Sequence, residues 1–297
     1  MLLLLFAPLL HAVPGAPECR PVREVEGEFV GSEEFSRGLL WKIHKDGNET
    51  NYLFGTIHVA DDRIVALPDP VKSALDGSRS FVMEVVPDLA QTLALSALMF
   101  YDDGTSLNQF LSDALFRRTV EILSSYHLPE EAVATMKPWA AFLTMSYPSD
   151  MRPVLDLQLL QHASEKGLQS HGLETLEEQG SIFNGLEFDE QLRLLMDTVC
   201  HYDVISADFE SLKKFYLERD LKGLYLFSQR HAFSDNSLYE RLTQRLLTDR
   251  NRIMTERMLP HLEKGSAFVA IGAMHLPGSE GVLESLASRG YEVTRVY

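Results

Sequence analysis

Two short motifs in the sequence place a histidine three residues after a glycine. The first, GTIH, ends at His58, and the second, GAMH, ends at His275. Each follows an apolar stretch that we predict to be a buried strand. Glycine permits a sharp turn, so each imidazole should stand at the edge of a sheet. A lone histidine at a strand end often serves only to cap a helix or bond a carbonyl, but two copies in the same setting are a stronger signal.

Acidic residues at the ends of two other predicted strands could join these histidines. Glu84 interrupts the apolar run FVMEVV, and Glu174 follows a predicted strand over 169–173. Ligands of open α/β sheets bind beyond the carboxyl ends of the strands. Imidazole and carboxylate together suit a divalent cation, so we predict His58, Glu84 and His275 as metal ligands. Glu84 could instead be the buried partner of an arginine, and Glu174 could belong to a solvated helix start.

Arg250 and Asn251 lie in a predicted helix and complete a candidate catalytic set with Glu84 and Glu174. A cation at Arg250 could stabilise a developing oxyanion or a substrate carboxylate. The alternative is a surface helix that carries ion pairs. The sequence contains no HExxH, GxSxG or GxGxxG motif, and the remaining histidines show no ligand spacing.

The elements that would position these residues predict an α+β fold with a mixed sheet. Both ends of the chain read as strand, GxxH, loop, short helix and strand, which suggests a pseudo-repeated pair of units with crossover helices. Long helical insertions separate them. Strands are expected over 38–44, 51–54, 79–85, 169–173, 267–271 and 291–296, and the turn residues KDGN between the first two predict a hairpin. Helices are expected over 68–75, in pieces over 88–161, and over 154–166, 188–227, 238–264 and 280–288.

Composition limits the classes of partner. The chain has 297 residues and a formal net charge of -16, because 43 Asp and Glu outnumber 27 Lys and Arg. This charge repels nucleic acid and anionic lipid head groups, and it also keeps a protein soluble without any partner. No later stretch resembles a membrane span. We therefore expect no nucleic acid partner and no stable membrane span.

The amino-terminal run MLLLLFAPLLHAV is too short to cross a bilayer and fits the apolar core of a signal peptide. We predict a signal peptide over 1–15, a polar leader over 16–37 and a single catalytic domain over 38–297. The protein would then be exported, either to the periplasm or to the outside of the cell. Cys200 reads as a core thiol, and export would also permit a bridge to Cys19. The sequence does not decide between these two states.

Several of these segments resemble the TraB/PrgY/GumN family, whose superfamily also contains the Tiki proteases. The similar segments are YLFGTIHVADDR, FVMEV, GLETLEEQ, DRN and FVAIGAMHLPGSEGVLESLASRGYEV, in that order along the chain. Two GxxH motifs and a strand-end glutamate form the family's signature, here His58, Glu84 and His275. Glu174, Arg250 and Asn251 match weaker family positions. The resemblance implies a Tiki/EreA/ChaN-like fold, and the missing carboxyl-terminal span favours an exported relative of bacterial type.

The function implied by this resemblance is that of a metal-dependent hydrolase, more specifically a peptidase that acts on a peptide or protein substrate. The resemblance to Tiki proteases favours manganese or cobalt, with zinc as the alternative. A bound ion would polarise a carbonyl and activate water, with a carboxylate as base. Two other functions remain open at this point: a peptide-binding or sequestering protein of the pheromone-inhibitor type, and a haem- or metal-binding protein.

Overall fold

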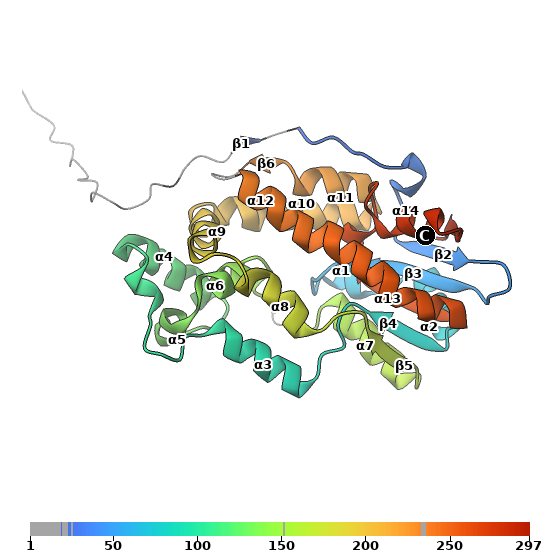
Figure 1. The fold of residues 1–297 in the computed structure, drawn as a ribbon, viewed down its shortest axis with the longest axis horizontal. Helices are drawn as coiled ribbons and strands as arrows, with labels where there is room; N and C mark the ends of the chain where they lie inside the picture. Colours follow the sequence, from blue (N-terminus) through green and yellow to red (C-terminus); the bar gives the residue numbers. More distant parts are fainter. Residues whose placement is uncertain (1–18, 20–22, 25, 151, 233–235) are drawn as a thin grey trace, which may run out of the picture.

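A mixed sheet of six strands forms the core of one half of the protein, beside a group of helices (Figure 1). The computed structural model describes Cys19 and residues 23–24, 26–150, 152–232 and 236–297, so the predicted signal peptide lies outside the described residues. The strands are arranged in the order β5-β4-β7-β3-β2-β8. Their bounds are β2 (Leu40–His44), β3 (Asn51–Thr56), β4 (Ser80–Met83), β5 (Gln169–Gly172), β7 (Ala267–Gly272) and β8 (Glu292–Arg295).

Four neighbouring strands, β5, β4, β7 and β3, run parallel to one another. The hairpin predicted at the start of the chain is present, because β2 pairs antiparallel with β3 and then with β8. The central strand β7 is buried along nearly its whole length, as expected for a parallel strand covered on both faces. The carboxyl ends of β3, β4, β5 and β7 therefore meet at one edge of the sheet. The α+β architecture and the mixed sheet are confirmed.

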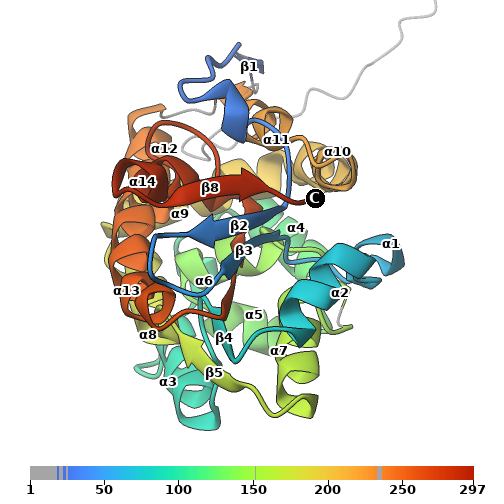
Figure 2. The same ribbon diagram turned by 90° about the vertical axis from the view of Figure 1, so that its right-hand side faces the viewer.

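Helices cover both faces of this sheet. Figure 2 shows α13 and α14 on one face and α1, α2 and α7 on the other. The bounds of these helices are α1 (Asp62–Val65), α2 (Asp69–Asp76), α7 (Leu155–Glu165), α13 (Arg250–Lys264) and α14 (Val282–Ser288). Their apolar side chains and those of the sheet form one hydrophobic cluster, in which Trp41, Phe81 and Phe268 are among the largest fully buried side chains.

A second hydrophobic cluster, which includes the fully buried Trp139, lies among most of the remaining helices. These helices are α3 (Leu89–Met99), α4 (Asp113–Ser124), α5 (Glu130–Thr135), α6 (Pro138–Met145), α8 (Leu176–Asn184), α9 (Phe188–Cys200) and α12 (Asn236–Thr243). Two further helices, α10 (Tyr202–Leu217) and α11 (Leu221–Ser228), contribute their buried side chains to the cluster of the sheet. Short 3-10 turns occur at η1 (Glu33–Phe35), η2 (Leu107–Gln109) and η4 (Ala273–His275). The helical insertions expected from the sequence thus build a second core beside the sheet.

Two predicted helical stretches are less regular than the sequence suggested. The stretch over 188–227 divides into α9, α10 and α11, with Arg219 at a positive φ of 57° in the second break. The stretch over 238–264 contains a π-helical segment, η3 (Gln244–Asp249), immediately before Arg250. Such segments often occur at functional sites because they change which residues face a cavity.

No helix of the described residues is long and apolar enough to cross a membrane.

The leader is tied to the rest of the protein. Cys19 forms a disulfide with Cys200 at the end of α9, and the two Cα atoms are 5.5 Å apart. Close by in the sequence, β1 (Arg23–Glu24) pairs with β6 (His231–Ala232). Cys200 is therefore a bridged cysteine and not the free core thiol that its apolar surroundings suggested. The bridge joins residues separated by 181 positions.

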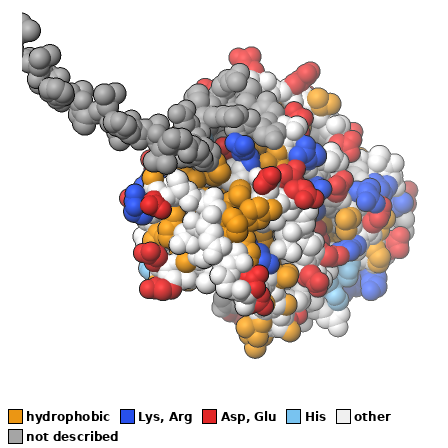
Figure 3. Space-filling model, turned by 60° about the vertical axis from the view of Figure 1, so that its left-hand side comes forward, with side chains coloured by type: hydrophobic (Ala, Val, Ile, Leu, Met, Phe, Trp, Pro, Cys, Tyr) orange, Lys and Arg blue, Asp and Glu red, His pale blue; other side chains and the backbone are white. Residues whose placement is uncertain are grey.

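Charged side chains of both signs are mixed on one face of the molecule. On the face drawn in Figure 3, acidic side chains lie beside lysines and arginines, and hydrophobic side chains gather in patches between them. This face offers no broad basic area of the kind that binds nucleic acid.

Candidate active site

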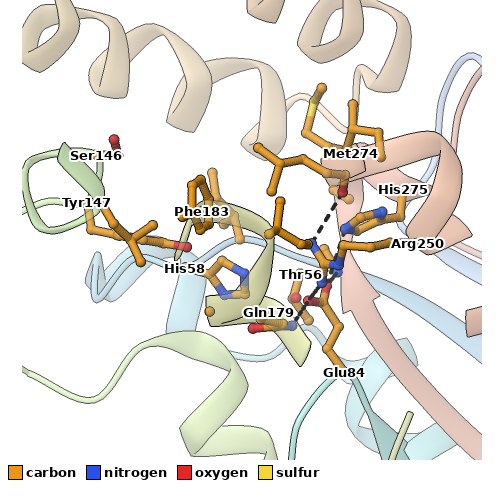
Figure 4. Close-up of a pocket in the computed structure, with 18 of the residues that line it drawn as sticks. Thr56, His58, Glu84, Ser146, Tyr147, Gln179, Phe183, Arg250, Met274 and His275 are labelled. Carbon is orange, nitrogen blue, oxygen red and sulfur yellow. Dashed lines mark hydrogen bonds and ion pairs between the residues drawn. The ribbon is translucent and has the colours of Figure 1, made fainter. Parts of the chain in front are cut away.

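The ends of three parallel strands bring the predicted residues to one cavity of about 390 Å³. His58 follows β3, Glu84 follows β4 and His275 follows β7, and all three side chains line this cavity together with Arg250. Figure 4 shows them converging, with Gln179 beside Glu84 and His58 on the side nearer Tyr147. The rule that parallel strands place their end residues at one edge explains this convergence.

Glu84 is buried, with 7% of its surface exposed, and its carboxylate is fully engaged. The Gly272 backbone N–H donates to Oε1 at 2.6 Å, and the Arg250 guanidinium donates to Oε2 at 2.6 Å. Gln179 adds a third, longer hydrogen bond of 3.3 Å. Burial alone would raise the pKa of Glu84, but His275, Arg250 and the Gly272 N–H together lower it to about 2. Glu84 is therefore an anion paired with an arginine, the alternative that the sequence left open.

Arg250 joins Glu84 to Glu174. Its Nε and Nη2 atoms lie 2.7 to 3.1 Å from the Glu174 carboxylate oxygens, and only 12% of its side chain is exposed. Burial favours the neutral guanidine, but hydrogen bonds and charges from both carboxylates hold the pKa of Arg250 above its usual range. Arg250 thus faces the cavity instead of the solvent. Glu174 is also buried and accepts a hydrogen bond from Gln179 at 3.1 Å, so it is not part of a solvated helix start.

His275 is oriented by Asn251. The Asn251 amide donates to the Glu280 carbonyl at 2.8 Å, which leaves Oδ1 facing His275 Nδ1 at 2.6 Å. This arrangement assigns the proton of the neutral imidazole to Nδ1 and the lone pair to Nε2. Nε2 lies 3.7 Å from Glu84 Oε1, which is longer than a hydrogen bond. Burial lowers the pKa of His275 to about 4, against the opposing effect of Glu84.

His58 is oriented by a carboxylate that the sequence analysis did not identify. Asp156, in the first turn of α7, has Oδ2 2.9 Å from His58 Nδ1 and accepts from the Thr56 hydroxyl at 2.6 Å through Oδ1. Burial alone would lower the pKa of His58, but the charge and hydrogen bond of Asp156 raise it to about 9. Asp156 could not be distinguished in the sequence, because an acidic residue in a first helical turn ordinarily has a capping role.

The side chains at the site are of the types that bind a metal ion, but their arrangement in this structure does not form a complete metal site. Each histidine has Nδ1 bound to a side-chain oxygen, which is how proteins orient a histidine whose Nε2 binds a metal. Glu84, however, already uses both oxygens for Gly272 and Arg250. Within the described ranges, no group of three or more His, Cys, Asp or Glu side chains is arranged to hold a metal ion.

Comparison with known proteins places the chain in a family. The TraB/PrgY/gumN family matches residues 39–295, which is most of the chain. The chain belongs to this family. The match includes the sheet, both GxxH segments and the helices that line the cavity. It therefore confirms the resemblance drawn from the short segments of the sequence.

Curated relatives of this TraB/PrgY/gumN protein include metalloproteases. It is 29% identical to metalloprotease TIKI2 of Danio rerio, over 88% of this chain and 61% of the relative. It is also 29% identical to metalloprotease TIKI1 of Homo sapiens, over 95% of this chain and 65% of the relative. The chain thus spans about three-fifths of the length of these relatives. No solved structure matches the chain.

Proposed function

We propose that this chain is a metal-dependent hydrolase that cleaves a peptide or protein. Its family membership and its distant similarity to proteins named metalloproteases support this proposal. The observation that carries it is the pair of oriented histidines, since Asp156 and Asn251 each hold an Nδ1 and leave an Nε2 beside the cavity. A histidine that served only to bond a carbonyl would not need this arrangement.

The residues proposed to hold the ion are His58, Glu84 and His275. Nitrogen and carboxylate donors of this kind accept manganese, cobalt or zinc, and the resemblance to Tiki proteases favours the first two. Arg250 also contacts Glu174, so its charge stays compensated when Glu84 engages a cation. The two GxxH segments follow adjacent parallel strands, which supports the further proposal that they are related repeats.

The chain supplies positioning and charge around the reacting bond. A bound divalent ion would polarise the scissile carbonyl and lower the pKa of a water molecule. Arg250 sits in the cavity wall, where its N–H groups can stabilise negative charge on the carbonyl oxygen. Glu174 and Asn251 do not line this cavity, so they act as positioning residues: Glu174 orients Arg250, and Asn251 keeps the proton on Nδ1 of His275.

A second candidate function is peptide binding without turnover. The ion pair of Glu84 with Arg250 favours it, because this pair satisfies the buried carboxylate without a cation. In that case peptides would occupy the same cavity and remain intact. The haem-binding alternative has no comparable observation in its favour.

The two functions are separated by incubating the purified protein with a peptide library after chelation and after addition of manganese, cobalt or zinc. We expect cleavage only with metal, and a loss of at least about a hundredfold in Glu84→Gln, the usual effect of removing a positioned acid–base group. Glu177→Gln is the matched control, because Glu177 is exposed and does not line the cavity. Tight peptide binding with no cleavage under any of these metals would favour the sequestering protein.

We also propose that the protein is exported. The bridge between Cys19 and Cys200 supports this, because disulfides persist mainly in oxidising compartments. The mature chain should then begin near Ala16. Amino-terminal sequencing of protein from its native location tests the proposal, and an intact Met1 on that protein would contradict it.

A further inference from the structure

The site lies where two cavities meet. The cavity of about 390 Å³ described above shares His58, Glu84, Tyr147, Leu176 and Gln179 with a neighbouring cavity of about 460 Å³. The candidate metal ligands His58 and Glu84 are thus in the wall common to both. A peptide bound across this junction would extend away from the proposed metal ligands in two directions, one into each cavity.

The first cavity is mostly apolar beyond this junction. Its wall there is formed by side chains of α3, α6, α8 and η3, namely Leu95, Phe142, Leu143, Ile182, Phe183 and Leu246. The acidic, basic and imidazole side chains that line it, which are His58, Glu84, Arg250 and His275, belong to the site itself. An apolar side chain of a ligand can therefore be buried against this wall. A polar side chain of a ligand would find no charged partner there. An acidic or basic side chain placed there would lose its hydration without compensation.

The second cavity continues on the other side of the junction. It is lined by Val59, Val85, Pro87, Pro148 and Val154 among others, and by Asp150 and Asp156. Both of these carboxylates are already paired, Asp150 with Arg152 and Asp156 with His58. The second cavity can therefore hold a further length of a substrate peptide, and its two aspartates are not free to bind a peptide terminus.

We propose that the first cavity selects substrates with a bulky apolar residue next to the scissile bond, and that the chain continues past the site into the second cavity. This proposal rests on the proposed hydrolase function, whose site it deepens by naming the substrate class. The occupant is a peptide segment with Leu, Phe or Met at the selected position. An apolar pocket discriminates between side chains by about 10- to 200-fold for each methylene it buries.

Leu95 and Leu93 provide a matched pair of variants. Both are in α3, a helix without a single buried residue, so a larger side chain should be tolerated at either position. Leu95 lines the first cavity, whereas Leu93 is 61% exposed and lines neither cavity. Leu95→Trp should narrow the cavity, and Leu93→Trp should leave it unchanged. Ile182→Trp, in α8, narrows the same cavity from another wall and serves if Leu95→Trp does not fold.

The test measures cleavage of peptides that differ only in the residues flanking the bond, with metal supplied. At one flanking position, wild type should cleave Leu, Phe or Met peptides at least about tenfold faster than Ala or Asp peptides. That preference should fall at least fivefold in Leu95→Trp or Ile182→Trp and persist in Leu93→Trp. Equal cleavage of all peptides, or a preference unaffected by both cavity variants, would overturn the proposal.

A binding measurement separates this proposal from the hydrolase itself. Fluorescein-labelled peptides with Leu or Ala at the selected position are titrated with chelator-treated protein, and binding is followed by fluorescence anisotropy. The Leu peptide should bind at least about tenfold more tightly, and Leu95→Trp should remove most of the difference. If this is seen while no peptide is cleaved, the cavity assignment stands and the hydrolase fails. If peptides are cleaved but neither assay shows an apolar preference, the hydrolase stands and the cavity assignment fails.

Discussion

The two GxxH segments have the same local sequence pattern but opposite surroundings. His275, after the central strand β7, has 6% of its side chain exposed and is held by the neutral amide of Asn251. His58, after the neighbouring strand β3, has 40% of its side chain exposed and is held by the carboxylate of Asp156. The pKa is lowered to about 4 at His275 and raised to about 9 at His58.

The difference between the two segments shows how one motif can serve two purposes. A buried histidine with an amide partner stays neutral, so His275 presents a fixed lone pair at the closed end of the site. An imidazole beside a carboxylate is a stronger base and a stronger ligand, so His58 suits the open end, where it meets both cavities. The comparison predicts that variants of the buried arm, His275 and Asn251, will lower stability as well as activity. Variants of the open arm, His58 and Asp156, will act mainly on activity.

The largest effect is expected from His275→Ala. This change removes a proposed ligand and leaves Asn251 Oδ1 without its partner in a buried place. Hydrolysis should fall at least about a hundredfold, the scale for loss of a positioned catalytic group. Peptide cleavage with metal supplied measures the effect, with His127→Ala as the control because His127 is exposed and lies outside the cavity. Full turnover in His275→Ala would contradict the metallohydrolase.

A smaller loss is expected from Asp156→Asn. The amide keeps the shape of the carboxylate but removes the charge that orients His58 and strengthens it as a ligand. Changes of such supporting residues reduce metal affinity or activity by about 10- to 100-fold. Activity and metal affinity should fall together in this variant. Asp156 raises the pKa of His58 to about 9 and so stabilises the fold below that pH, and the urea midpoint should therefore match wild type only when it is measured above pH 9. A large drop in stability without a drop in metal affinity would assign Asp156 a purely structural role.

The smallest effect on activity, and a clear effect on stability, is expected from Asn251→Ala. This change leaves His275 Nδ1 and the Glu280 carbonyl without their hydrogen bonds. A buried polar group without a partner destabilises a protein by about 1–3 kcal/mol. Urea unfolding should therefore show a loss of this size, larger than that of Asp156→Asn. Equal stabilities of the two variants would remove the distinction between the buried and the open arm.

Local patterns explain which parts of the site were predictable. The strands before His58, Glu84 and His275 are apolar runs that end at glycine or at a charged residue. The rule for parallel strands then brings their ends together, so the convergence on one cavity could be anticipated. The turn residues between β2 and β3 likewise predicted the hairpin that the structure contains.

The partners of these residues could not be predicted, because they depend on tertiary contacts. Asp156 lies 98 residues from His58 along the chain and lacks a motif that would single it out. The sequence offered arginine pairing for Glu84 only as an alternative, and nothing in it identified Arg250 as the partner. Gln179, which bonds both Glu84 and Glu174, reads in the sequence as an ordinary polar residue of a helix.

The central claim is that His58, Glu84 and His275 bind one divalent cation, and calorimetric titration tests it most directly. Manganese, cobalt and zinc are each titrated into chelator-treated wild type, His275→Ala and Glu84→Gln. We expect wild type to bind one ion per chain, with affinity reduced at least about a hundredfold in either variant, because each loses a direct ligand. Absence of binding by wild type for all three metals, or unchanged affinity in both variants, would contradict the claim.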